Sequence, residues 1–578
     1  MEKPISDLHC HPSLKPNGNS DIKDIWISTK NKKVQDFFKG LISPRRGMIK
    51  SILKPMATYS QSNLDNCYLG SNRLVFCSIY PFERSFITPD RPFSDSSGMQ
   101  RFILKMIFGK KVKEHVDRKL IQLLTGISKK SAQAYLDEVH RSGIIDYYKD
   151  YKKEYKFLIQ SNGTSSTNEE FSVKPRFNLV SNYEEYQEKS ISPQAICGIL
   201  SVEGMHAIAR YRKEDLFGKN TISELDPPNK NALESQFKQH ILEIKSSTDM
   251  PFVPFFITYS HHFNNLLAGH AKSFADAPNR IKPGFADVFD QKKGMNLGIS
   301  PFGKELIKEH LLSRDNGPRI LIDTKHMSLK ARDDIFEIAK YFKANSDPFP
   351  LICSHTAVNG LDSRETAANQ PDINRYEKDS YVSKFDINLT DQDIEEIWET
   401  DGLIGICMHD GRMPGGKFKK YFKKISGMFR SKEVKKRVHA QMFLTNIFHV
   451  AKVNLGYIRK RNMQNPGQPI DEKQAWKTIS LGTDNDGIVD PFDHFNTAER
   501  LRDFRIKLAE LMKWNNADHM KKYKILSLPS EIPFTDDAIL DIMQGFSPKE
   551  ITDMVFYENT RTFLSKYFTE VYLKGLAV

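Results

Sequence analysis

The stretch Asp7-Leu8-His9-Cys10-His11-Pro12 decides how the rest of the chain is interpreted. Two histidines stand one residue apart at the end of a short run that is typical of a β-strand. Because strand side chains alternate between two faces, His9 and His11 point to the same side, where two imidazoles can share one metal ion. A surface turn with two solvated histidines explains the same six residues. Further ligands at matching places downstream must decide between the two interpretations.

Short apolar runs, each followed by a residue suited to metal binding or proton transfer, recur along the chain. With the first stretch included, eight runs are predicted to be strands: 5–8, 74–80, 195–202, 251–260, 319–325, 349–354, 402–408 and 478–483. Helical patterns lie between several of them, at 303–312, 329–344 and 390–400. Strands that alternate with helices favour a parallel sheet, and eight of them predict an α/β fold, a (β/α)8 TIM barrel with helical insertions.

The polar residues fall where the predicted strands end, which is the face on which barrel enzymes build their active sites. His9 and His11 are predicted to hold one divalent ion and His326 and His355 a second, with Glu203 as the bridge. Imidazole and carboxylate ligands suit zinc. Two such ions polarise a substrate oxygen and lower the pKa of a shared water.

The last predicted strand runs into Asp484, which is expected to take a proton from the attacking water and pass it to the leaving group. A salt bridge or a helix N-cap would also explain this aspartate. His261 follows the fourth predicted strand at the same level of the barrel.

Five further motifs appear in a fixed order: Ser201-Val-Glu203-Gly204-Met-His206, Gly298-Ile-Ser-Pro301-Phe302-Gly303, Leu321-Ile-Asp323-Thr-Lys-His326, Ser354-His355 and Gly482-Thr-Asp484-Asn-Asp486-Gly487. Together they resemble the membrane (renal) dipeptidase family of the amidohydrolase superfamily, and the resemblance extends to Glu558-Asn559-Thr560-Arg561. It implies a two-zinc barrel that hydrolyses dipeptides. It also implies that His9, Glu203, His326 and His355 are ligands, that Asp484 is the acid/base residue, and that His261 contacts the substrate and the developing oxyanion.

The chain departs from that family at three places. His11 stands where the family has aspartate, so metal binding is expected to survive with a changed metal preference. Ile387 replaces an arginine that binds the substrate carboxylate, and Arg364 or Arg375 is expected to substitute for it. Lys325 stands beside His326, where a small polar residue is usual.

Length and composition are compatible with one elaborated domain. We expect a single metal-dependent hydrolase barrel over residues 1–578, with a helical insertion at 84–190 and a basic helical insertion at 410–477 after the seventh strand. Hydrophobic residues make up 39% and charged residues 27%, which is ordinary for a globular protein. No apolar run is long enough for a membrane span. The first strand begins too early to leave room for a signal peptide, so a cytoplasmic location is expected.

The net charge of +13 raises the question of an anionic partner. Between residues 417 and 439 there are ten Lys or Arg and one Glu, which gives +9 of the total, and the rest of the chain is nearly balanced. A solvated helical face explains this segment, so nucleic acid is not the expected partner. A small peptide or other amide is the expected substrate, and a homo-oligomer stays open.

Two other functions remain open at this stage. Metal-dependent phosphoesterases and nucleases also use histidine pairs on barrels, and the basic segment could attract phosphates. A barrel that has lost catalysis could instead use its insertions to bind partners. The complete set of ligands together with an acid/base residue favours an enzyme, namely a zinc-dependent hydrolase of the dipeptidase type.

Overall fold

A parallel barrel forms the centre of the protein. The computed structural model describes residues 3–17, 24–26, 60–87, 118, 121–122, 125, 127–273, 291–370, 380–425, 432–512 and 536–575. Within them, eight strands pair in the order β1-β2-β5-β7-β8-β9-β10-β11, and all neighbours are parallel. They are β1 (Ile5–Cys10), β2 (Asn72–Ile79), β5 (Ala195–Glu203), β7 (Phe256–Thr258), β8 (Leu321–Asp323), β9 (Ile352–Thr356), β10 (Leu403–Ile406) and β11 (Ile479–Leu481). The predicted (β/α)8 fold is confirmed.

The first and last strands of this order come together and nearly close the barrel. The backbone N–H of Asp484 donates to the carbonyl of His9 at 2.9 Å, and the N–H of His11 donates to the carbonyl of Asn485 at 2.9 Å. The carboxylate of Asp7 adds a side-chain link, because it accepts from the hydroxyl of Thr483 at 2.6 Å. Both ends of the chain therefore contribute to the same rim of the barrel.

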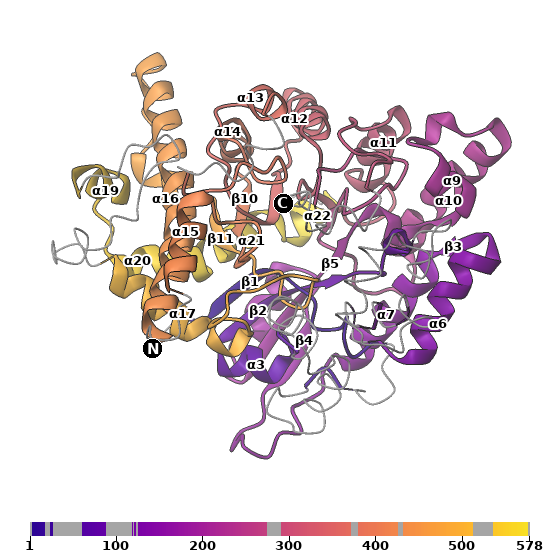
Figure 1. Cartoon of the computed structure of the whole chain (residues 1–578), viewed down its shortest axis with the longest axis horizontal. Helices are drawn as coiled ribbons and strands as arrows, with labels where there is room; N and C mark the ends of the chain where they lie inside the picture. The colour runs from indigo at the N-terminus through magenta and orange to yellow at the C-terminus, as the bar shows by residue number, and fades with distance from the viewer. Residues whose placement is uncertain are drawn as a thin grey trace.

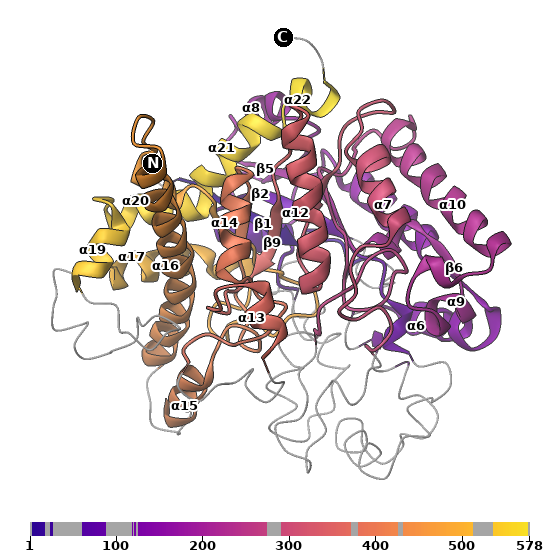
Figure 2. The same cartoon turned by 90° about the horizontal axis from the view of Figure 1, so that it is seen from above.

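Helices cover the outside of the strands (Figure 1). The helices that follow successive strands are α3 (Leu64–Leu69), α9 (Lys213–Gly218), α10 (Pro227–Ser246), α11 (Pro301–Glu305), α12 (Leu329–Ala344), α13 (Arg364–Ala368), α14 (Asp391–Glu399), α15 (Gly416–Ile425), α16 (Lys432–Gln464) and α17 (Leu501–Leu511). Four more complete the chain: α19 (Asp536–Met543), α20 (Pro548–Asp553), α21 (Asn559–Tyr567) and α22 (Glu570–Lys574). In Figure 2, α12 and α14 stand over the strands, and α14 packs against α16.

Two helices show how local sequence sets these elements. The hydroxyl of Ser328 caps α12 by accepting from the N–H of Ala331 at 3.1 Å, and α12 ends at Ala344 as the helical pattern predicts. Thr390 and Asp393 form the reciprocal capping box at the start of α14, which satisfies two backbone donors that a helix end leaves open. The Ser328 cap places α12 directly after the turn that carries His326, whereas α13 lies between α14 and β9, the strand that carries His355.

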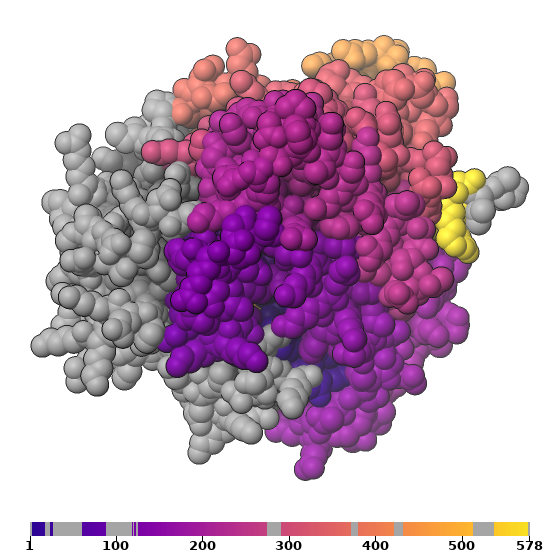
Figure 3. Space-filling model, turned by 90° about the vertical axis from the view of Figure 1, so that its right-hand side faces the viewer, coloured from indigo at the N-terminus to yellow at the C-terminus, as the bar shows by residue number. Residues whose placement is uncertain are grey.

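The segment 84–190 contains more than helices. It holds α6 (Lys129–Asp137), α7 (Tyr147–Ser161) and α8 (Tyr183–Lys189), together with β3 (Ile144–Asp146) and β4 (Arg176–Leu179). Strand β4 pairs in parallel with β5, so this segment adds a strand to the barrel sheet. Figures 1 and 2 show α6 and α7 beside α9 and α10 at the end of the molecule opposite α16, and this part of the chain, in purple and magenta, forms the middle of the face seen in Figure 3.

The basic segment divides into an outer and an inner part. Helix α15 carries five of the lysines, whereas every residue of α16 from Val438 to Ala451 is buried. A helix that is buried all round belongs to the interior rather than to a solvated face. The division of the chain into a barrel and two insertions stays a prediction. No helix among the described residues is long and apolar enough to cross a membrane, and all six cysteines are buried and unpaired.

Candidate metal centre

Seven residues that the sequence singles out meet at the C-terminal rim of the barrel. They come from the ends of six different strands or from the turns that follow them, and none has more than 5% of its surface exposed: His9, His11, Glu203, His261, His326, His355 and Asp484. The backbone at two of them is unusual. His326 has φ 66° and Asp484 has φ 58°, a left-handed region that costs free energy for these residues and is concentrated at functional sites.

The imidazole nitrogens form two close pairs. Nε2 of His9 lies 3.1 Å from Nε2 of His11, and Nε2 of His326 lies 3.2 Å from Nε2 of His355. Two nitrogens bound to one tetrahedral zinc at about 2.0–2.1 Å are separated by roughly 3.3 Å. Both pairs therefore have the spacing of ligands that share an ion.

Glu203 lies between the two pairs. Its Oε1 is 3.3 Å from Nε2 of His9 and 3.6 Å from Nε2 of both His326 and His355, and its Oε2 is 3.2 Å from Nε2 of His11. Within the described part of the chain, neither oxygen accepts a hydrogen bond. A buried carboxylate without hydrogen bonds is costly, and a bridging position between cations would compensate for this cost.

The groups of close ligand atoms differ from the pairs of histidines that the sequence predicts. The ligand atoms of His9, Glu203, His355 and Asp484 all lie within 4.8 Å of one another, and those of His261, His262 and His326 form a second group. His355 thus approaches the first strand as well as His326, with its ring 4.1 Å from that of His9. Strands β1 and β9 are not neighbours in the sheet, so this closeness arises across the inside of the barrel, and sequence spacing does not reveal it. The residues fit divalent ions, whereas their assignment to two ions stays a prediction.

The pKa values of Glu203, His326 and His355 favour the protonation states that bind cations. Burial would raise the pKa of Glu203, but attraction to His261, His9 and His11 outweighs it and holds the pKa well below its usual range. Burial, with repulsion from neighbouring cationic groups, holds the pKa of His326 and of His355 well below the usual value. The carboxylate is therefore ionised and these two imidazoles are neutral at neutral pH, which are the forms that bind metal.

His11 and His261 behave in the opposite way. Burial lowers the pKa of His11, but attraction to Glu203 and Asp484 outweighs this effect and raises it to about 10. The pKa of His261 rises to about 9 because Glu203 and Glu83 outweigh its burial. A metal ion next to His11 would have to displace a proton, whereas a protonated His261 suits a hydrogen-bond donor.

A shell of hydrogen bonds orients the histidines. Nδ1 of His11 faces the carbonyl of Ser78 at 3.0 Å, so in the neutral imidazole the proton lies on Nδ1 and Nε2 is free for a metal. Nδ1 of His355 lies 2.9 Å from the hydroxyl of Ser354, which donates to Asp323 at 2.6 Å. Such outer contacts fix the ring orientation that a metal site requires.

Sequence reasoning missed Glu83, which orients His261. Oε2 of Glu83 lies 2.6 Å from Nδ1 of His261, while Nε2 of the same ring lies 3.2 Å from Oε1 of Glu203. Oε1 of Glu83 also accepts from the N–H of Phe263 at 3.2 Å. The sequence could have identified Glu83, because it is an acidic residue that follows the second predicted strand, at the level of the barrel rim.

Arg364 does not join this cluster. Its guanidinium binds Asp333 at 2.6 Å, Asp393 at 2.8 Å and both oxygens of Glu396, and these contacts hold α13 against α12 and α14. A role for Arg364 in substrate binding stays a prediction, and Arg375 lies outside the described residues.

The charges of two cations that sequence reasoning did not assign act on the site. The charges of Lys325 and Arg412 both act on Asp484, and burial with repulsion from Arg412 lowers the pKa of Lys325 to about 8. Lys325 precedes His326, and Arg412 lies in the turn after β10.

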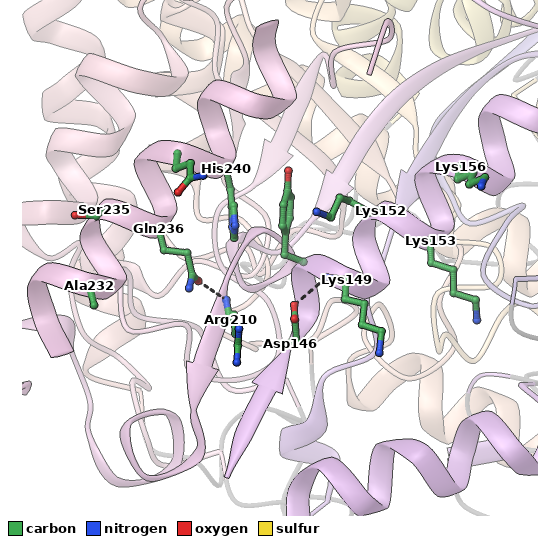
Figure 4. A pocket seen from close by; sticks show the side chains of 12 residues that line it. Asp146, Lys149, Lys152, Lys153, Lys156, Arg210, Ala232, Ser235, Gln236 and His240 are labelled. Atoms are coloured by element: carbon green, nitrogen blue, oxygen red, sulfur yellow. Dashed lines mark hydrogen bonds between the residues drawn. The ribbon is translucent and has the colours of Figure 1, made fainter. Parts of the chain in front are cut away.

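A basic cavity elsewhere is separate from the metal centre. It has a volume of about 860 Å³ and lies between α7 and α10, lined by Lys149, Lys152, Lys153, Lys156 and Arg210 (Figure 4). At its wall, Tyr148 stacks on His240 with ring centroids 3.7 Å apart. None of the predicted metal ligands lines this cavity.

Comparison with known proteins gives structural matches alone. No protein-family model and no curated protein matches the sequence. Among solved structures, the chain is similar to the dipeptidase AC, a metallopeptidase of family M19, with 12% identity, TM-score 0.41, and coverage of 98% of this chain and 99% of that one.

Two further structures are similar over comparable lengths. A metallopeptidase from Rhodobacter sphaeroides, bound to a phosphinate mimic of L-Ala-D-Ala, has 11% identity, TM-score 0.40 and coverage of 98% and 99%. The probable dipeptidase PvdM from Pseudomonas aeruginosa has 12% identity, TM-score 0.37 and coverage of 92% of this chain and 98% of that one.

Proposed function

We propose that this protein is a divalent-metal-dependent hydrolase of small amides, with dipeptides as its substrates. The observation that carries the proposal is the arrangement of two imidazole pairs around one carboxylate. The Nε2 atoms within each pair are 3.1 Å and 3.2 Å apart, and both oxygens of Glu203 lack hydrogen bonds from the described residues. Buried groups of this kind are stable only beside cations.

The ions would be held by His9 and His11 on one side, by His326 and His355 on the other, and by Glu203 between them. Imidazole and carboxylate ligands without thiolates favour zinc among the common divalent metals. When bound, such ions supply a water of lowered pKa and polarise the substrate carbonyl.

Asp484 is the proposed acid/base residue. Its Oδ1 is buried, receives no hydrogen bond from the described residues, and lies 3.5 Å from Nε2 of His11 and 3.8 Å from Nε2 of His9. It would accept a proton from the water that attacks the carbonyl carbon. It would then deliver that proton to the amine nitrogen as the C–N bond breaks, which regenerates the carboxylate.

His261 is proposed to stabilise the negative charge that develops on the carbonyl oxygen. Glu83 holds its Nδ1, so Nε2 presents an N–H toward the centre of the site. Attraction to both carboxylates keeps this ring protonated, because its pKa is about 9. A positively charged donor fixed in place before the reaction is the kind of group that oxyanion stabilisation requires.

The dipeptide assignment rests on the resemblance of the ordered motifs to the membrane dipeptidase family. The burial of every proposed ligand supports it as well, because residues with at most 5% exposure cannot be reached by an extended chain without rearrangement. A phosphoesterase would use similar ligands, so the substrate panel must include both classes.

The test combines metal analysis with a substrate panel. After purification with added zinc, the protein is expected to contain up to two divalent ions by mass spectrometry and to hydrolyse dipeptides in preference to an aryl phosphodiester. Glu203→Ala should lose metal, whereas Asp484→Asn should keep metal and lose about 100-fold or more in kcat. Glu184→Gln, on an exposed helix face, is the matched control. A metal-free protein, or one that cleaves only the phosphodiester, would refute the proposal.

A further inference from the structure

The basic cavity between α7 and α10 takes no part in the proposed function. We propose that it binds a small molecule that carries two phosphate groups, held by Lys149, Lys152, Lys153, Lys156 and Arg210. Figure 4 shows the lysines along α7, with Arg210 and the side chains of α10 across from them. The inference does not depend on the proposed function, because the cavity shares no residue with the metal centre.

The charges of α7 are divided between two faces of the helix. Its acids point toward the barrel, where Asp150 binds Arg84 and the buried Glu154 accepts from the hydroxyl of Ser13 at 2.6 Å. Its four lysines line the cavity and recur at intervals of three and four residues, which places them on one face. Like charges at these intervals destabilise a helix. An anion bound in the cavity would remove this repulsion.

Few acids offset these cations. Asp146 lines the cavity, but its Oδ1 accepts from the backbone N–H of Lys149 at 3.0 Å, as the N-cap of α7. Oε1 of Glu243 lies 3.8 Å from Nζ of Lys152. The charge of Lys149 also acts on Glu138, although Glu138 is bound to a buried arginine at 2.9 Å.

The other cations of the cavity lack a carboxylate partner. Lys149, Lys153, Lys156 and Arg210 form no ion pair with any residue that the structure describes. An exposed lysine needs no partner, so the absence of a pair at one position means little. The convergence of five cations on one hollow is different, because each of them raises the cost of placing the next. A bound anion explains this arrangement.

The number of charges indicates the ligand. Five cations and Asp146 give the lining a net charge of +4, or +3 when Glu243 is included. A phosphate monoester carries about −1.5 to −2 at neutral pH, so two of them carry about −3 to −4 and match the lining. Lys149 and Lys156 are seven residues apart in α7, which corresponds to about 10.5 Å along the helix axis. Two separate phosphates can therefore each meet the lysines of a different turn.

The aromatic groups of the cavity leave no surface for a nucleobase. The ring of His240 stacks on Tyr148 with centroids 3.7 Å apart and an interplanar angle of 17°. Nζ of Lys152 lies 4.5 Å from the centroid of the same tyrosine, so it covers the face that His240 leaves open. Single-stranded nucleic acids need open aromatic faces on which bases stack. Charge rather than stacking would therefore select the ligand.

The wall contributed by α10 is uncharged and offers hydrogen bonds. It consists of Ala232, Ser235, Gln236, Gln239 and His240. Oε1 of Gln236 accepts from the backbone N–H of Arg210 at 2.6 Å, which leaves the amide NH2 to donate to a phosphate oxygen. Burial lowers the pKa of His240, so this ring is neutral and adds no charge to the lining.

Calorimetry with fructose 1,6-bisphosphate and fructose 6-phosphate tests the site. The zinc-loaded protein is expected to bind the bisphosphate at least about tenfold more tightly than the monophosphate. Replacing Lys149, Lys153 and Lys156 together by Gln should remove this preference while the metal content stays unchanged, which shows that the variant folds. Arg210→Gln, on a different element, should weaken bisphosphate binding by about three- to tenfold on its own.

The matched control removes three exposed lysines of α12 in the same way, by replacing Lys330, Lys340 and Lys343 with Gln. It should bind the bisphosphate as the natural protein does, and any binding of phosphate at the metal centre is common to all these proteins. Equal affinities for the two sugar phosphates would overturn the inference. An unchanged affinity for the bisphosphate in the cavity variant would also overturn it.

Two further probes identify the class of ligand. Phosphatidylcholine vesicles with about 5% phosphatidylinositol 4,5-bisphosphate test whether the two phosphates belong to a lipid headgroup. Capture of the natural protein but not of the cavity variant would place them on a lipid, whereas binding of the soluble bisphosphate alone would place them on a free metabolite. Both results agree with a site for two phosphates. A short oligothymidylate that binds more tightly than the bisphosphate, and loses affinity in the cavity variant, would assign the cavity to nucleic acid and overturn the inference.

Discussion

Glu154 offers a quantitative test of how the inserted helix is joined to the floor of the site. This residue of α7 has 1% of its surface exposed. Its Oε1 accepts from the hydroxyl of Ser13 at 2.6 Å, and its Oε2 accepts from the N–H of Tyr80 at 3.2 Å. The carboxyl group therefore connects α7 to the loop after β1 and to the end of β2. Burial raises its pKa from 4.5 to about 7, although these hydrogen bonds oppose the increase.

The free energy of unfolding depends on pH through this group. Because the folded protein binds the proton more tightly than the unfolded chain, the contribution of Glu154 is most favourable below pH 4.5 and is lost as the pH rises to about 7. At about 1.4 kcal/mol per pH unit, the difference between 4.5 and about 7 corresponds to a loss of about 3 kcal/mol. Glu154→Gln keeps the shape of the side chain and cannot ionise.

Urea unfolding of both proteins, with chelator present, measures the effect at pH 5 and pH 8. The variant is expected to gain about 2–3 kcal/mol relative to the natural sequence between the two pH values. Each comparison is made at one pH, so titration of all other groups cancels. Glu184→Gln, which removes an exposed carboxylate, should show no such gain. If the difference between Glu154→Gln and the natural protein is the same at both pH values, the carboxylate is accommodated without cost and the reasoning is refuted.

Three further predictions concern the site itself. Removing metal with a chelator should lower the unfolding temperature by about 5 °C in scanning calorimetry, because the ions bind the folded state alone. Added zinc should restore the unfolding temperature. An unchanged temperature would contradict a metal centre. Glu83→Gln should lower the pKa of His261, so the alkaline limb of the kcat/KM profile should move down by about one pH unit; a profile identical to that of the natural protein would show that Glu83 does not act on the ring. Gly204→Ala should destabilise the fold by about 2 kcal/mol or more in urea unfolding, because φ is +93° and the added Cβ would lie 2.3 Å from Nδ1 of His206. Gly218→Ala, where a Cβ meets nothing within 4 Å, is its control.

The fold was predictable because its signals are local. Each barrel strand is a short apolar run, and caps such as that of Thr390 on α14 lie within three residues of their partners. Strand β4 was not predicted, because Arg176–Leu179 is only four residues long and is recognised as a strand only by its pairing with β5. The buried part of α16 was also missed, since the lysines and arginines around it dominate the composition of that segment.

The predicted ligands meet because barrel topology brings all strand ends to one rim, whatever the loops between them do. Long side chains are different, since the reach of an arginine depends on the loop that carries it. Arg364 and Arg412 both follow barrel strands, yet Arg364 ion-pairs with Asp333, Asp393 and Glu396, while the charge of Arg412 acts on Asp484 and Glu203. Nothing in their sequence neighbourhoods distinguishes the two. The grouping of His355 with His9 likewise follows from barrel closure and not from spacing along the chain.

Closure of the barrel between its first and last strands has a consequence for the order of events during synthesis. The contact between Asp7 and Thr483 spans 476 residues. At roughly 5–20 residues per second, the ribosome needs about 25–95 s to make the chain between them. His9 and His11 therefore emerge long before Asp484 is translated, and a truncated product would present two histidines without the opposite wall of the site. We expect the nascent chain to remain catalytically silent until nearly the whole protein has left the ribosome.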